Sequence, residues 1–92
     1  MKVTLEYFGQ LRPAAGVNAE SMEVTDGTTA QDALKQVALK YGGVFSRIVL
    51  DDNGGIRPSL MVIVNERAID KSTPHLLANG DAVGLLAAMA GG

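Results

Sequence analysis

The feature that most limits the fold is a single amphipathic helical segment, residues 30–41, set among stretches that alternate like β-strands. Its apolar side chains recur at the spacing that places them on one helical face: Ala30, Ala33, Leu34, Val37, Ala38 and Tyr41. Thr28 is predicted to cap the start of this helix with Gln31 as its capping-box partner, and Gly42-Gly43 is predicted to end it. A helix with one apolar face among strands predicts an α+β domain.

Four further stretches have the alternation of apolar and polar residues, or the apolar runs, that predict strands: 2–8, 19–25, 59–65 and 82–88. In the first of them, Val3, Leu5 and Tyr7 share one face. The glycines and the proline between the first two strands predict the turn of a hairpin at residues 9–16.

The first and last strands are strongly apolar, so they are predicted to lie side by side at the centre of the sheet. This order of elements predicts a β-grasp fold of the α+β class, in which a mixed sheet of four to five strands packs one main helix across one face. Another small α+β sandwich is the alternative from pattern alone. The domain is expected to span residues 1–88, with a flexible tail at residues 89–92.

Three connections are less determined. Residues 44–50 are apolar enough to form either a short helical turn or a buried extended segment, and a polar loop follows them. Residues 65–67 are predicted to turn, after which Ala68-Ile69 pair briefly. A single helical turn is predicted within residues 72–79, because Thr73 is a good N-cap and Pro74 suits the first helical position.

Composition and charge remove several classes of function. The net charge is −2 with a pI near 5.1, and the basic residues are scattered singly, so a nucleic-acid partner is not expected. The absence of cysteine removes disulfides, thiolate metal sites and cysteine nucleophiles, and it fits a cytoplasmic protein. No apolar run is long enough to span a bilayer, so no membrane association is expected.

Conventional catalytic and metal sites are not indicated. His75 is the only histidine, and its place after a proline favours a surface or capping role. Asp51 and Asp52 are adjacent in a glycine-containing loop, where carboxylates are usually solvated. We therefore expect no catalytic residue and no metal in this chain.

The C-terminus is the unusual feature, because the last strand runs into the small residues Met89-Ala90-Gly91-Gly92. Two final glycines adopt any backbone conformation and present no Cβ to a narrow channel. Such a tail, reaching roughly 15 Å when extended, suits a carboxylate that is threaded into a partner's active site. A frayed terminus or a cloning accident is the alternative explanation.

A docking surface is predicted beside this tail. The central strands are apolar on both faces, and one helix covers only one of them. The uncovered face is predicted to expose a patch made of Phe8, Met61, Ile63 and Leu86, as docking sites do. The patch would not exist if residues 44–50 fold over this face, or if the face assignment is displaced by one residue.

Short stretches spread over nearly the whole chain resemble the MoaD/ThiS family of sulfur carrier proteins, which are β-grasp relatives of ubiquitin. The matching stretches occur in the family's order: Tyr7-Phe8-Gly9-Gln10-Leu11-Arg12, Asp26-Gly27-Thr28-Thr29-Ala30-Gln31-Asp32-Ala33-Leu34, Val64-Asn65-Glu66, Asn79-Gly80-Asp81-Ala82-Val83 and Ala90-Gly91-Gly92. The chain length looks more like MoaD or the mycobacterial-type cysteine-biosynthesis carrier than ThiS. It departs from the pattern with Ala87-Ala88 where members often carry proline, and with Pro13 after Arg12.

The resemblance implies that Gly92 is the working residue. A ubiquitin-activating-type adenylyltransferase would use ATP to adenylate its carboxylate, and a sulfur donor would then leave a Gly92 thiocarboxylate. Met89, Ala90 and Gly91 would be threaded into the partner. The acceptor would be an enzyme such as the large subunit of molybdopterin synthase, which makes this chain a co-substrate and not an enzyme.

Three other functions remain open. A ubiquitin-like modifier would use the same activated carboxylate to form isopeptide bonds with lysines of other proteins, and the sulfur could instead serve cysteine or thiamine biosynthesis. A plain binding module would tolerate deletion of Gly91-Gly92, whereas the other readings predict complete loss of function with an intact fold.

Overall fold

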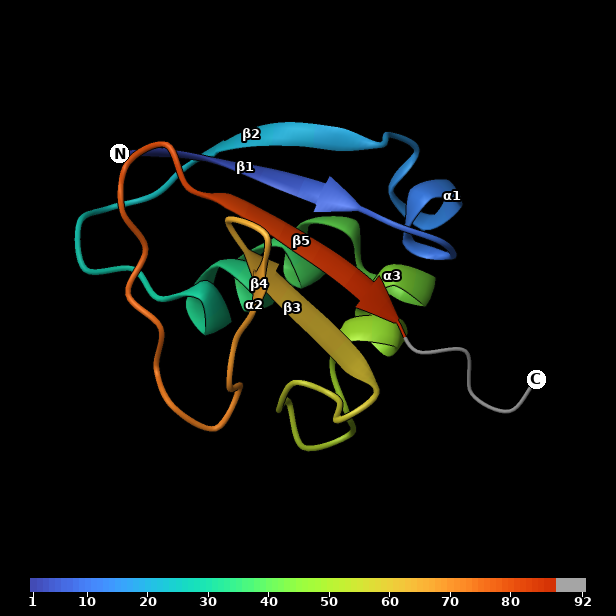
Figure 1. Cartoon of the computed structure of the whole chain (residues 1–92). Coiled ribbons are helices and arrows are strands. Elements are labelled where there is room, and N and C mark those ends of the chain that lie inside the picture. The colour runs from blue at the N-terminus through green and yellow to red at the C-terminus, as the bar shows by residue number, and fades with distance from the viewer. Residues whose placement is uncertain (88–92) are drawn as a thin grey trace.

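The computed structural model describes residues 1–87, so the predicted tail residues Met89, Ala90, Gly91 and Gly92 lie outside the described part. The described elements follow one another along the chain (Figure 1) as β1 (Lys2–Tyr7), α1 (Leu11–Ala15), β2 (Ala19–Glu23), α2 (Ala30–Tyr41), α3 (Gly43–Val49), β3 (Leu60–Val64), β4 (Arg67–Ala68) and β5 (Ala82–Ala87).

The five strands form one mixed sheet in the order β2-β1-β5-β3-β4. β1 and β5 are parallel neighbours near the centre, with Leu5 opposite Val83 and Tyr7 opposite Leu85. The other pairs are antiparallel. The predicted central pair is therefore confirmed, and the sheet with α2 across one face is the predicted β-grasp arrangement.

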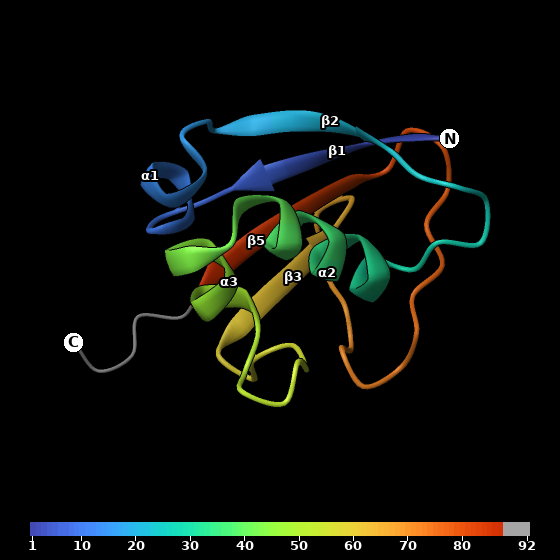
Figure 2. The same ribbon diagram turned by 180° about the vertical axis from the view of Figure 1, so that it is seen from behind.

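One face of the sheet is covered by helices. Figure 2 shows α2 and α3 lying together in front of the strands, on the side opposite to the viewer in Figure 1. On β1, β3 and β5, eight residues of this face are at most 5% exposed: Val3, Leu5, Tyr7, Leu60, Val62, Val64, Val83 and Leu85. The predicted inward face of β1 is confirmed, and this packing forms the core.

Helix α2 spans the predicted residues 30–41, but its N-cap lies one residue after the predicted Thr28. Thr29 is the N-cap: its side chain accepts a hydrogen bond from the Asp32 N–H, and the Asp32 carboxylate accepts one from the Thr29 N–H. Thr28 and Gln31 do not form the capping box, because Thr28 is buried and the Gln31 amide binds a distant loop. The predicted apolar face is confirmed, and Gly42, with a φ of +60°, ends the helix.

Residues 44–50 are mostly helical, which resolves the open choice at this segment. Phe45 and Val49 on α3 are buried in the core beside α2. Phe45 also contacts Tyr7 edge to face, with 5.3 Å between ring centres. Because α3 lies on the same side as α2, it does not cover the opposite face of the sheet (Figure 2).

The helical turn predicted within residues 72–79 is wrong. This segment is irregular and contains no helix, and Leu76 forms an isolated β-bridge with Thr29. The Gln31 side chain holds it, since its amide N–H groups donate to the carbonyl oxygens of Lys71 and Thr73 and its oxygen accepts from the His75 N–H. These bonds satisfy backbone groups that a local helix would otherwise pair.

Lys71, directly before the same segment, binds the chain that leads into β3. Its ammonium donates to the carbonyl oxygens of Arg57 at 3.1 Å and Pro58 at 2.9 Å, and also to that of Leu60. The chain leading into β3 is thereby joined to the segment that follows β4. An ammonium has three donors, so this arrangement uses its full capacity.

A carboxylate joins β2 to α2. Glu20 accepts hydrogen bonds from the Tyr7 hydroxyl at 2.6 Å, from the Tyr41 hydroxyl, and from the Lys40 ammonium at 2.7 Å. Burial by itself would raise the pKa of Glu20, but the bonds from Lys40, Tyr41 and Tyr7 together lower it. Burial, reinforced by the nearby carboxylate, raises the pKa of Tyr7.

Within residues 1–87, no helix combines the length and the apolar character needed to cross a membrane.

Candidate functional site

The face of the sheet opposite the helices exposes the predicted patch residues. Met61 on β3 lies opposite Leu86 on β5, and Ile63 lies opposite Gly84. Phe8 directly follows β1, and its N–H donates to the Leu85 carbonyl at 3.1 Å. Met61 is 48% exposed and Leu86 37%, while Phe8 and Ile63 are half-buried. The register therefore brings all four residues together on one surface, here called the open face.

Gly84 shapes the centre of this surface. A Cβ built on Gly84 would lie 3.1 Å from Cε2 of Phe8 and 3.7 Å from Cβ of Ile63. The Phe8 ring thus lies over bare backbone of β5, which contributes to its half-burial. A larger residue here would push the ring away from the strand.

Arg12 borders the patch and was not predicted as a site residue. Its Nε donates to the Tyr7 carbonyl oxygen at 2.8 Å, and its guanidinium carbon lies 5.6 Å from the centre of the Phe8 ring. The only sequence signal was its position in the Gln10-Leu11-Arg12 stretch. A contact with Phe8 depends on how α1 returns to the sheet, which no local pattern specifies.

The open face becomes polar away from β3 and β5. On β1 the outward residues are Lys2, Thr4 and Glu6, and the register places Glu23 of β2 opposite Lys2. The apolar surface is therefore confined to the side of the sheet from which β5 leads toward the tail. Figure 1 shows β5 ending beside α3 at the start of the C-terminal segment.

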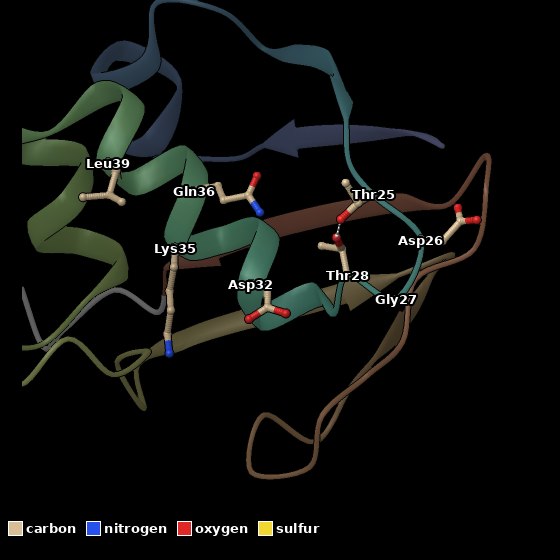
Figure 3. A pocket seen from close by; sticks show the side chains of 8 residues that line it. All are labelled: Thr25, Asp26, Gly27, Thr28, Asp32, Lys35, Gln36 and Leu39. Atoms are coloured by element: carbon tan, nitrogen blue, oxygen red, sulfur yellow. Dashed lines mark hydrogen bonds between the residues drawn. The ribbon is translucent and has the colours of Figure 1, made fainter.

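A shallow surface recess of about 430 Å³ lies on the other side of the molecule, between α2 and the loop at residues 25–28 (Figure 3). Three of its polar groups have structural roles: the Thr25 and Thr28 hydroxyls hydrogen-bond each other at 3.3 Å, and Asp32 caps α2. Figure 3 shows the Lys35 side chain directed away from the threonine pair. This recess surrounds the capped start of α2, and the side chains that line it do not suggest catalysis.

Two other carboxylates, those of Asp51 and Asp81, also serve the fold. Asp51 accepts hydrogen bonds at one oxygen from the N–H groups of Asn53 and Gly55, which closes its loop. The Ala78 N–H and the Asn65 amide lower the pKa of Asp81. Within the described residues, no three histidine, aspartate or glutamate side chains are grouped as a metal site requires.

The predicted role of the C-terminal residues stays a prediction. Gly92 and the tail residues before it lie outside the described part of the chain, which ends with Ala87 on β5. The docking role of Phe8, Met61, Ile63 and Leu86 is likewise a prediction, although the four side chains do share one surface.

Comparison with known proteins identifies the family. Residues 5–92 match the ThiS family model. The chain is 30% identical over 98 residues to small archaeal modifier protein 3 of Haloferax volcanii, covering 100% of both chains. It is 24% identical to the molybdopterin synthase sulfur carrier subunit of Chlamydomonas reinhardtii, again over 100% of both.

A solved structure agrees with these relatives. The crystal structure of SAMP1 from Haloferax volcanii superimposes with a TM-score of 0.86 at 25% identity, covering 100% of both chains. The β-grasp fold, the family match over nearly the whole chain and the relatives therefore agree. This chain belongs to the ThiS family of ubiquitin-like carrier and modifier proteins.

Proposed function

We propose that this protein is a sulfur carrier whose Gly92 carboxylate is adenylated and then converted to a thiocarboxylate. The observation that carries the proposal is the position of β5. This strand lies between β1 and β3, and its end adjoins the apolar part of the open face. A rigid strand beside a docking surface would deliver the following residues 88–92 to a bound partner in a defined direction.

The chemistry follows from the weakness of a carboxylate as an electrophile. The Gly92 carboxylate oxygen would attack the α-phosphorus of ATP in the activating enzyme, forming an acyl adenylate and releasing pyrophosphate. A sulfur nucleophile such as hydrosulfide would then attack the acyl carbon. The bond between that carbon and the phosphate oxygen would break, and AMP would leave. The product is a thiocarboxylate held on a protein, so docking would deliver the sulfur without release of free sulfide.

The acceptor is proposed from the relative in Chlamydomonas reinhardtii, which is a molybdopterin synthase sulfur carrier subunit. By analogy, the thiocarboxylate of this chain would insert into a synthase large subunit and supply sulfur for molybdopterin. The catalytic groups would then belong to the partners, and this chain would act as a co-substrate.

Protein modification is the second candidate, favoured by the 30% identity to small archaeal modifier protein 3. In this case a lysine amine would attack the acyl adenylate in place of sulfur, giving an isopeptide bond at Gly92 and releasing AMP. The two functions share their first step and differ in the nucleophile.

Intact-protein mass spectrometry separates these possibilities. The chain would be incubated with its cognate activating enzyme, ATP and a sulfide source, beside a control that lacks Gly91-Gly92. An AMP adduct, or the exchange of one oxygen for sulfur, in the full-length chain alone is the expected result. Conjugates to lysine in an extract would favour modification, and the absence of any adduct would reject both proposals.

The docking role of the open face has its own test. Ile63→Glu and Leu86→Glu are expected to stay folded and to weaken binding to the activating enzyme strongly, because each places a charge in a desolvated contact. Leu39→Glu is the matched control, since Leu39 is 82% exposed on the outer side of α2. Equal binding by all three variants would show that the open face does not dock this partner.

A further inference from the structure

The guanidinium of Arg12 is held in place at the margin of the apolar part of the open face. Arg12 is the second residue of α1, directly after Leu11, which is fully buried. The backbone turns sharply before it at Gly9, where φ is +57°. The base of the Arg12 side chain is therefore fixed to the domain.

The far end of the side chain is oriented as well. The Nε hydrogen bond to the Tyr7 carbonyl and the contact with the Phe8 ring set the plane of the guanidinium. Guanidinium has five N–H donors, and this hydrogen bond uses one. Within residues 1–87, the terminal nitrogens of Arg12 have no hydrogen-bond acceptor and no carboxylate partner.

Other cations of the described chain are engaged differently. Lys40 pairs with Glu20, Lys71 binds three carbonyl oxygens, and Lys2 lies 3.9 Å from Glu23 at the polar end of the open face. Arg57, like Arg12, donates its Nε to a backbone carbonyl, that of Arg47. Arg12 differs from all of these because it is oriented against a residue of the predicted docking patch, with donors to spare.

We propose that the protein that adenylates Gly92 presents an aspartate or glutamate carboxylate to the terminal N–H groups of Arg12, at the edge of an apolar contact. This inference rests on the proposed function and names the chemistry of the partner's surface. Two parallel N–H donors match the two oxygens of a carboxylate, and partial removal of water by the surrounding apolar contact strengthens the pair.

The position of Arg12 gives this contact a use beyond affinity. Tyr7, whose carbonyl holds Arg12, lies opposite Leu85 in the parallel register, two residues before β5 ends at Ala87. A carboxylate bound to Arg12 would fix the orientation of the partner close to the start of the tail. The net charge of this chain is −2, so its overall charge would repel an acidic surface on the partner. The contact therefore depends on the local position of Arg12.

The test is a direct binding measurement by calorimetry between the full chain and its cognate activating enzyme, without ATP. Arg12→Glu is expected to weaken binding at least about tenfold, because it sets two carboxylates against each other. Arg12→Lys keeps the charge but loses the planar fork, and it is expected to restore affinity only in part. Lys35→Glu is the matched control, with the same change of charge on α2, behind the sheet.

Thermal unfolding of each variant verifies that the fold is unchanged. Equal affinities for Arg12→Glu and Lys35→Glu would overturn the inference, and so would the absence of binding by the wild-type chain. Rescue of Arg12→Glu by a carboxylate-to-arginine change in the enzyme would support it. If the wild-type chain binds but no adenylate forms, the proposed function is rejected. The affinities of Arg12→Glu and Lys35→Glu then still decide whether the Arg12 contact exists.

Discussion

The two faces of the sheet are built from neighbouring residues but have different roles. Leu85 and Leu86 are consecutive in β5, yet Leu85 is completely buried under the helices and Leu86 is 37% exposed. Val62 and Met61 on β3 repeat this contrast, at 2% and 48%. Because side chains alternate along a strand, one sequence segment can supply stability to one face and a binding surface to the other.

The comparison also shows how an apolar open face is compatible with a stable domain. Phe8 is half-buried against Gly84, so part of the patch is sheltered by the sheet itself. The rest of the face carries Lys2, Thr4 and Glu6, which confines the exposed apolar area. The covered face should therefore account for most of the free energy of unfolding.

The largest expected effect separates the faces directly. Leu85→Ala should lower the free energy of unfolding by about 2–5 kcal/mol, because it leaves a cavity in the core. The adjacent change Leu86→Ala should cost about 0.5 kcal/mol or less, since that side chain faces solvent. Urea denaturation measures both, and similar losses for the two variants would contradict the division between the faces.

A smaller effect is expected at the rim of the covered face. Gln31→Leu removes the bonds that join α2 to residues 71–75 and should destabilise the domain by about 1–3 kcal/mol. Amide exchange at His75 should accelerate more than exchange in the central strands. Gln36→Leu on exposed helix surface is the control, and an equal loss there would mean that helix propensity and not the link is responsible.

The Glu20 cluster should make the covered face sensitive to acid. The pKa of Glu20 is lowered by folding, so its contribution is complete above its unfolded pKa and is lost as the pH falls through the folded value. Glu20→Gln should cost about 1 kcal/mol at neutral pH. The difference from wild type should shrink on acidification below about pH 4, and thermal melting at several pH values checks this. A constant difference would show that Glu20 is not the titrating group.

The smallest effect is expected at the turn between β3 and β4, outside both faces. Asn65 and Glu66 have φ angles of +50° and +73°, the pattern of a two-residue type I′ turn. Glycine suits the second position better than glutamate does, so Glu66→Gly should stabilise the domain by about 0.5 kcal/mol. Destabilisation, measured by urea denaturation, would mean that the Glu66 side chain makes a contact that outweighs its backbone conformation.

Local periodicity was enough to predict β1, α2, β3 and β5, because each has a face buried along its whole length. It was not enough where two signals compete within a few residues. Thr28 and Thr29 are equally good caps, and only the tertiary structure selects Thr29 by burying Thr28. Pro13 was taken as part of a turn, but it lies in the first turn of α1, where the missing N–H costs nothing.

Long-range contacts account for the other differences. Thr73-Pro74 is a genuine helix-start signal, but Gln31, more than forty residues earlier, pairs the backbone of that segment instead. For the open face, alternation placed Met61, Ile63 and Leu86 together. The shelter that Gly84 gives to Phe8, and the placement of Arg12, depend on strand register and on α1, which the sequence pattern does not encode.

The binding of Lys71 to three carbonyl oxygens also bears on how the chain resists proteases. No lysine or arginine follows Lys71, so one tryptic cut after it would separate β5 and everything up to Gly92 from the rest of the domain. A trypsin-like enzyme needs that side chain extended into its specificity pocket, whereas here the ammonium is directed inward. Cleavage at this bond therefore requires the segment to open first, so the contact that orders the loop also protects the bond after Lys71.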